Sequence, residues 1–362
     1  MRRRLRTALE AVLFGGLALG WGCGAGSVPQ LPAGKRAAAP PRSLKVVTWA
    51  AYITPGVAAD FEKRTGVHLQ IDFINSNEEV MRRLLAGERW DVWTPSGSVV
   101  QEAAAKGLLA RLPASAIPNL GKIGRRFLNP AYDPELLYSA PFYWGTTGLG
   151  YDRRAFSEPP ASWGYLFDPR LARPQSGKIS LLNDPRDALG AALIYLGLPP
   201  NSTDAGELAR ARDLLEASEK NFAAIDSESY LDRLAAGRVV LAQGWSGDLA
   251  RLAARAPHLA FTLPREGYLL WIDNLSILAS SDAKEAAAEL LNFLLEPAVA
   301  ARLSNENRTA VTVAAALPLL DSEVRDGPSY QLPEGVPYHI VRGLGPARAL
   351  VDRFWLDFTR PH

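Results

Sequence analysis

The amino-acid sequence predicts an α/β protein with two lobes, each built on a mainly parallel sheet that is flanked by helices. Three observations support this fold class. The chain has 362 residues, which is long for a single hydrophobic core and suits two. Strand and helix patterns alternate along it, as is typical of parallel sheets covered on both faces. Polar N-cap residues and glycines mark the ends of the helices at regular intervals.

The first 43 residues differ from the rest. Residues 1–22 combine a basic start with a short apolar run, which predicts a signal peptide rather than a spanning helix. The only cysteine, Cys23, follows this run and resembles a bacterial lipoprotein processing site; a cleaved secretory protein with a free thiol is the alternative. Residues 23–43 carry Gly, Ser, Ala and four prolines, which predict a flexible tether. Either leader takes the protein out of the cytoplasm.

Three strand and helix pairs follow. Strands are expected at 44–49, 67–73 and 90–93, where β-branched and aromatic residues gather. Polar residues start the helices after them, and glycines end these helices at Gly66, Gly87 and Gly107. Ligands of parallel sheets collect beyond the carboxyl ends of the strands, so residues 49–52 and 95–98 are candidates for a site.

The rest of the chain repeats this alternation. One strand, at 268–277, places Trp271 and Asp273 on the same face, because strand side chains alternate with a period of two. Burying an unpaired carboxylate is costly, so Asp273 either pairs with an arginine or faces a cleft. The further predicted segments are an extended, glycine-rich stretch at 143–151, strands at 178–182 and 238–243, and helices at 186–196, 246–254, 283–295 and 346–358.

Charge and motifs narrow the function. The net charge is +2, but the leader carries four arginines and one glutamate and the tether three basic residues, so the part from Leu44 onward has a charge of −4. Nucleic-acid binding is therefore not expected. The four histidines are scattered, and HExxH, GxSxG, GxGxxG and P-loop motifs are missing from the sequence. We expect neither an enzyme nor a bound cofactor or metal.

Nine short motifs, taken in order and spacing, resemble the spermidine/putrescine-binding proteins of bacterial ABC importers. The likeness extends from about Leu44 to the C-terminus. The motifs are Thr48–Tyr52, Pro55–Gly56, Ser76–Glu78, Pro95–Ser96, Tyr143–Thr147, Asn183–Asp187, Gly244–Asp248, Trp271–Asp273 and Leu291–Pro297.

The resemblance implies a two-lobed type II periplasmic binding protein with its ligand cleft between the lobes. The implied lobes are 44–148 plus 272–316 and 149–271 plus 317–362, after the signal peptide and tether. It further implies a monomer outside the cytoplasm, attached to the membrane if Cys23 is lipidated. Such a protein captures a polyamine, putrescine or spermidine, and delivers it to the membrane subunits of an ABC permease.

The resemblance also implies a set of ligand-binding residues. Trp49, Tyr52, Trp245 and Trp271 would form aromatic walls, Asp273 would be the main ammonium acceptor, Asp184, Asp187 and Asp248 would be further acids, and Ser96 would add a polar contact. Taken singly, each tryptophan is compatible with core packing and the Asp184–Asp187 pair with helix capping.

Four positions depart from the family pattern. Ala50 and Ala51 replace an acid or threonine, and Ser98 replaces an aromatic residue. Arg308 aligns with a tyrosine; it either points outward, pairs with Asp187 or reports a ligand with an acidic group. The alternatives are therefore a binder of another small solute, such as an amino-phosphonate, thiamine or an anion held by Arg308, and a polyamine sensor without transport.

Overall fold

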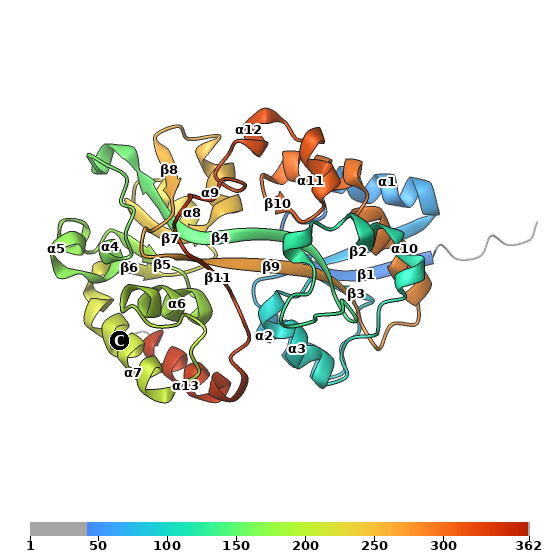
Figure 1. The fold of residues 1–362 in the computed structure, drawn as a ribbon, viewed down its shortest axis with the longest axis horizontal. Coiled ribbons are helices and arrows are strands. Elements are labelled where there is room, and N and C mark those ends of the chain that lie inside the picture. Colours follow the sequence, from blue (N-terminus) through green and yellow to red (C-terminus); the bar gives the residue numbers. More distant parts are fainter. Residues whose placement is uncertain (1–41, 361–362) are drawn as a thin grey trace, which may run out of the picture. The chain divides into compact units, whose positions relative to one another are not determined.

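Two long antiparallel strands, β4 (Ala140–Asp152) and β9 (Tyr268–Ile277), connect the two halves of the fold (Figure 1). The computed structural model describes residues 42–360. The two strands pair from Ala140 opposite Leu275 to Thr147 opposite Leu269. Every residue of β4 is buried, because further elements cover both of its faces. Each strand begins in one hydrophobic core and ends in another.

The first lobe, as we name it, surrounds the amino-terminal strands. Here β2, β1 and β3 are parallel, and the end of β9 pairs antiparallel with β3. Helix α1 starts at a proline and ends before Gly66, whose φ of 71° suits a left-handed cap. Its elements are β1 (Arg42–Trp49), α1 (Pro55–Thr65), β2 (Val67–Ile74), α2 (Asn77–Leu85), β3 (Val92–Trp93), α3 (Gly97–Ala105), α10 (Lys284–Leu294), α11 (Pro297–Asn307), β10 (Ala310–Val311) and α12 (Ser322–Arg325).

The second lobe is formed around the parallel strands β6, β5 and β7, with β4 antiparallel to β7 and β8. Strand β11 pairs with β9 and leads the chain back to this lobe for its last helix. The elements are α4 (Gly164–Phe167), α5 (Pro169–Ala172), β5 (Ile179–Leu181), α6 (Pro185–Tyr195), α7 (Ala205–Ser218), β6 (Phe222–Ile225), α8 (Tyr230–Ala235), β7 (Leu241–Trp245), α9 (Ser246–Ala253), β8 (Leu259–Thr262), β11 (Tyr338–Ile340) and α13 (Arg348–Phe358).

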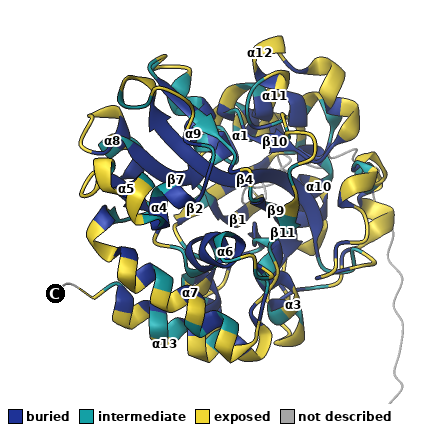
Figure 2. Ribbon diagram, turned by 60° about the vertical axis from the view of Figure 1, so that its left-hand side comes forward, coloured by how far each residue is buried: buried dark blue, intermediate teal, exposed yellow. Residues whose placement is uncertain are grey.

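Burial follows the expected pattern of an α/β fold. The central strands and helix α6 are buried, whereas α7 and α13 alternate buried and exposed positions along their length (Figure 2). Such two-sided helices pack one apolar face on the sheet and leave the other in water. The α/β class predicted from the sequence is therefore found, and the parallel strands of each lobe are joined through antiparallel β4 and β9.

The leader predictions concern residues that the structure does not describe. The signal peptide at 1–22, Cys23 and most of the tether lie outside the described range, and β1 begins at Arg42. Within residues 42–360, no helix has the length and apolar character needed to cross a membrane.

Candidate functional site

Asp273, on β9, is a buried carboxylate held by donors from the first lobe. Its residue surface is 5% exposed, Ser96 Oγ donates to Oδ1 at 2.6 Å, and the Tyr52 hydroxyl donates to Oδ2. Burial raises the pKa of Asp273 to about 6, and the two hydroxyl donors limit the rise. Among residues 42–360, no arginine, lysine or histidine forms an ion pair with it. This carboxylate can therefore accept a cation that the protein itself does not provide.

The indole of Trp271 lies against β4, on the face of β9 that also carries Asp273. Trp271 is opposite Gly145 in the ladder, and a Cβ at Gly145 would overlap the six-membered ring of the indole. Glycine at this position therefore lets the ring approach the strand. Nε1 of Trp271 is buried without a hydrogen-bond partner in the described structure. The predicted shared face of Trp271 and Asp273 is thus an aromatic surface next to an acid.

A second acidic group lies in the second lobe, where helix α6 begins. Asp187 accepts from Thr147 Oγ1 at 2.7 Å and from Trp245 Nε1 at 2.8 Å. Asp184 is the N-cap of α6 and accepts from the amides of the first turn. Burial, followed by the charge of Asp184, raises the pKa of Asp187 to about 7, and burial also raises the pKa of Asp184. The capping role and a role in cation binding are compatible.

The two groups are separated along β4. Asp273 is paired with Tyr143 in the ladder, whereas Asp187 bonds to Thr147. Four residues of strand correspond to roughly 13 Å at about 3.3 Å per residue. Gly145 and the Trp271 ring lie between them. An apolar segment flanked by two acids matches a linear molecule with a cation at each end.

Asp248, in the first turn of α9, differs from Asp184, Asp187 and Asp273 because it forms an ion pair in the described structure. Arg251 Nη2 donates to Oδ1 at 2.5 Å, and the Tyr230 hydroxyl donates to Oδ2 at 3.0 Å. Burial and then Asp273 contribute most to the raised pKa of Tyr52, and the charge of Asp248 contributes least, so Asp248 lies within electrostatic range of Tyr52.

Two further candidates contact residues other than these acids. Trp49 is partly buried, packs against a first-lobe core and donates from Nε1 to the carbonyl of Thr94 at 3.0 Å. Arg308 adopts a φ of 58° at the end of α11, and its guanidinium lies 3.4 Å from Glu323, which is largely exposed. Arg308 is therefore not paired with Asp187.

The chain is similar to known proteins along most of its length. A family model described as bacterial extracellular solute-binding protein matches residues 56–328. The chain belongs to this family. It is 33% identical over 308 residues to a putrescine/cadaverine-binding protein of Pseudomonas aeruginosa, covering 82% of this chain and 87% of that protein. It is 32% identical over 316 residues to the putrescine-binding periplasmic protein PotF of Escherichia coli, covering 83% and 85%.

Solved structures agree with this assignment. A putative spermidine/putrescine ABC transporter structure from Listeria monocytogenes matches with a TM-score of 0.82 at 28% identity, covering 88% of this chain and 98% of that one. The predicted two-lobed binding-protein fold, the family resemblance and the location outside the cytoplasm are thereby confirmed. The family comprises binding proteins for transport rather than enzymes.

Sequence reasoning missed several residues of this solute-binding protein that position the candidate acids. Tyr143 is buried, donates to the carbonyl of Tyr52 at 3.1 Å and accepts from Asn307 at 2.8 Å. Thr147 lies within the motif Tyr143–Thr147, but its hydrogen bond to Asp187 joins segments that are 40 residues apart in the sequence. Arg251 had a local signal, because it follows Asp248 by three residues on one helix face.

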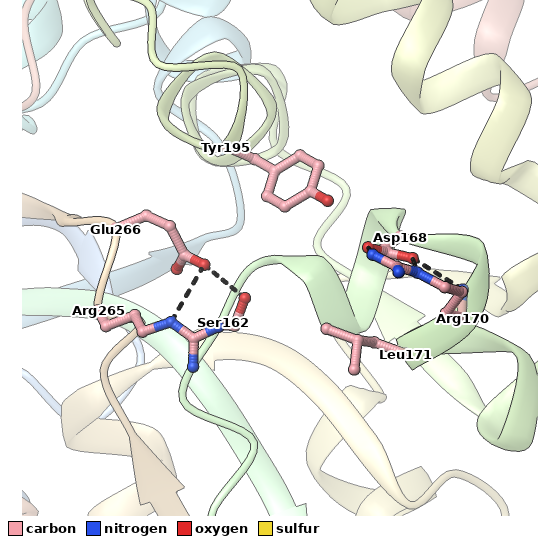
Figure 3. A pocket seen from close by; sticks show the side chains of 7 residues that line it. All are labelled: Ser162, Asp168, Arg170, Leu171, Tyr195, Arg265 and Glu266. Atoms are coloured by element: carbon pink, nitrogen blue, oxygen red, sulfur yellow. Dashed lines mark hydrogen bonds and ion pairs between the residues drawn. The ribbon is translucent and has the colours of Figure 1, made fainter.

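A hollow of about 400 Å³ in the second lobe is distinct from the candidate site of this solute-binding protein (Figure 3). Its arginines are paired with neighbouring acids, Arg170 with Asp168 at 3.3 Å and Arg265 with Glu266 at 3.9 Å. Ser162 also donates to Glu266 at 2.5 Å. None of the predicted ligand-binding residues lines this hollow, whose lining is Ser162, Asp168, Arg170, Leu171, Tyr195, Arg265 and Glu266.

Proposed function

We propose that this solute-binding protein captures a linear polyamine of the putrescine class between its lobes and delivers it to an ABC importer. The observation that carries the proposal is the environment of Asp273. This carboxylate is buried, receives neutral donors from Ser96 and Tyr52, and shares a face of β9 with Trp271. The names of the relatives, which bind putrescine, cadaverine or spermidine, support the same ligand class.

The physical case rests on the structure of a polyamine, which is a flexible apolar chain with an ammonium group at each end. A cation over an aromatic face gains about 0.5–2 kcal/mol, depending on how far it is removed from water. A hydrogen bond to an ionised carboxylate contributes about 1.5–3 kcal/mol. We assign one ammonium to Asp273 and the other to Asp187 and Asp184, with the methylenes along Trp271. Trp49, Tyr52, Ser96 and Trp245 complete the proposed set as walls and donors.

Closure of the two lobes would complete this site. Ser96 and Tyr52 belong to the first lobe, whereas Asp187 and Trp245 belong to the second. A ligand that contacts both shifts the population toward the closed form, which the permease would recognise. The lobes proposed are 44–148 with 272–316 and 149–271 with 317–362, except that α12 and the segment up to Tyr330 contact the first lobe and are placed with it. A monomer attached to the membrane through Cys23 is part of the same proposal.

The position of Arg308 argues against the main alternative. An anion binder would need this guanidinium in the cleft, but it lies beside Glu323 at 3.4 Å. Asp248 is likewise balanced by Arg251. A cationic ligand therefore fits the acids better than an anion fits the arginine.

Calorimetric titration tests the proposed function. The purified protein is titrated with putrescine, cadaverine, spermidine and spermine, with glutamate and thiamine as controls. We expect micromolar or tighter binding of at least one amine and no binding of glutamate or thiamine. If none of the four amines binds, the ligand assignment is refuted, whereas the fold assignment is unaffected.

A further inference from the structure

The hydroxyl of Ser96, the residue at the start of helix α3, points to Asp273 rather than to its own helix. A serine in this position normally accepts from an amide of the first turn, as Ser76 does from Glu79 at 3.0 Å at the start of α2. Within residues 42–360, the Ser96 hydroxyl forms no such cap and instead donates to Asp273 Oδ1 at 2.6 Å. An uncapped helix start is less stable, so this orientation of Ser96 requires support from neighbouring residues.

Asn77 holds the backbone of Ser96. Its Oδ1 accepts from the amide of Ser96 at 3.1 Å, and the residue is only 9% exposed. Asn77 is the first residue of α2 and directly follows Ser76, whose cap fixes the start of that helix. A capped helix start thus positions the acceptor that fixes the start of α3.

The neighbours of Ser96 are held by β9 and by Tyr132. The amide of Asn274, on β9, donates to the carbonyl of Pro95 at 2.9 Å. On the other side, a Cβ at Gly97 would overlap the ring of Tyr132, so glycine lets this ring cover the turn. The Tyr132 hydroxyl in turn donates to Asn274 Oδ1 at 3.0 Å. The turn is thus fixed before and after Ser96, and the side chain from α2 supplies the bond to the serine itself.

We propose that Asn77 is a positioning residue for ligand binding, because it fixes Ser96 so that the serine hydroxyl reaches Asp273. The inference rests on the proposed polyamine function and adds α2 to the elements that build the site. In this role Asn77 acts through Ser96 and needs no contact with the ligand. The Ser76–Glu78 motif thereby gains a physical role, with Ser76 as the helix cap and Asn77 as the anchor of the neighbouring turn.

The position of Ser96 affects the pH at which Asp273 ionises. Burial raises the pKa of Asp273 to about 6, and hydrogen bonds from Ser96 and Tyr52 limit the rise. Tyr52 and Tyr132 both lie within electrostatic range of this carboxylate, but burial raises the pKa of each phenol, so both stay neutral near pH 7. If the Ser96 hydroxyl turns away, the pKa of Asp273 rises further and a proton competes with the ligand ammonium.

Asn77→Ala removes the anchor and should cause a loss of affinity that depends on pH. Because the pKa of Asp273 rises further in this variant, putrescine affinity should fall less than about twofold at pH 8 and about fivefold or more at pH 6, relative to wild type. Asp187, which burial and the charge of Asp184 bring to a pKa of about 7, titrates in both proteins, so its effect cancels in this ratio. Calorimetric titration of the full chain at the two pH values measures the ratio.

Two comparisons separate positioning from a general loss of structure. In a Ser96→Ala background, Asn77→Ala should cause no further loss at pH 6, because the hydroxyl that it orients is already gone. Asn292→Ala on α10 is the matched control, because Asn292 Oδ1 accepts from the amide of Asn119 at 3.0 Å. It should leave putrescine affinity unchanged at both pH values.

Circular dichroism and thermal unfolding verify that each variant is folded. If Asn77→Ala is unfolded, Asn77→Ser replaces it, because serine is favoured at the start of a helix and its side chain is shorter than that of asparagine.

The outcomes distinguish this inference from the proposed function. If wild type binds an amine but the loss in Asn77→Ala is equal at both pH values, or adds fully to the loss in Ser96→Ala, the positioning role is overturned while polyamine capture stands. Unchanged affinity at pH 6 has the same consequence. Failure of wild type to bind any amine overturns both. A loss that grows as the pH falls and vanishes in the Ser96→Ala background supports the assignment.

Discussion

At the scale of single residues, Asp273 combines a cost in stability with a function. Its carboxylate is buried without a protein cation, an arrangement that a protein optimised only for stability would avoid. Ser96 and Tyr52 stabilise the ionised form but do not restore the ordinary pKa. The energy of the site therefore depends on what occupies it.

Replacement of this acid should weaken ligand binding strongly. Asp273→Asn keeps the shape of the side chain but removes its charge, so a charge-assisted contact of about 1.5–3 kcal/mol is lost. We expect putrescine affinity to fall about 10- to 150-fold in calorimetric titration. Asp213→Asn, at an exposed position of α7, is the matched control. An unchanged affinity in Asp273→Asn would remove Asp273 from the site.

The same substitution should stabilise the ligand-free protein at neutral pH. The pKa of Asp273 is about 6 in the folded state and about 3.9 when unfolded, so the folded state holds the proton more tightly. Through this group, the free energy of unfolding therefore falls by about 3 kcal/mol as the pH rises from 4 through 6. Thermal unfolding should show Asp273→Asn melting above wild type at pH 7.5 and with a smaller difference at pH 4. A variant equally destabilised at both values would contradict this account.

Part of the site could be read from the sequence because it is local. Trp271 and Asp273 share a face through the strand period, and Asp184 caps a helix, as expected. The contacts of Tyr143 and Thr147 could not be read, because they join segments 40 or more residues apart. The partner of Arg308 could not be predicted either, because the path of the chain after α11 brings Glu323 beside it.

At the scale of elements, capping residues, glycines and prolines in the sequence predicted the ends of most helices and strands to within a few residues. Helix 186–196 is found as Pro185–Tyr195, and helix 283–295 as Lys284–Leu294. The strand expected at 238–243 begins only at Leu241, because its pairing with β4 and β5 decides where it starts. The order of strands in the sheet depends on such long-range pairing and could not be read from local patterns.

Strand β4 shows how an element shapes the site. A methyl group at Gly145 would overlap the Trp271 ring, so Gly145→Ala should displace the indole that forms the proposed aromatic wall. We expect at least a tenfold loss of putrescine affinity and a cost of about 1–3 kcal/mol in stability from overpacking. Gly121→Ala, where a Cβ would meet no atom within 4 Å, is the control. Calorimetry and denaturant unfolding measure the two effects; wild-type affinity in Gly145→Ala would exclude Trp271 as a wall.

At the scale of the described molecule, the two lobes also meet through polar and charged side chains outside the candidate site. Arg348, which begins α13 of the second lobe, lies 3.4 Å from Glu78 on α2 and 3.7 Å from Glu102 on α3. Asn75 of the first lobe donates to Glu228 of the second at 3.1 Å. These contacts exist only while the lobes are together, so they add to the stability of the closed form.

The Arg348 contacts should tune affinity without touching the ligand. Arg348→Ala removes both ion pairs between the lobes, and exposed pairs are worth about 0–1 kcal/mol each. Because closure and binding are coupled, putrescine affinity should fall by a few-fold at low salt. The difference from wild type should shrink at 1 M salt, where screening removes the attraction in both proteins. Arg212→Ala, which breaks ion pairs within α7 alone, should leave affinity unchanged. Calorimetric titration at two salt concentrations measures the putrescine affinity. If the loss of affinity in Arg348→Ala persists at high salt, the residue acts through packing within its own lobe rather than through closure.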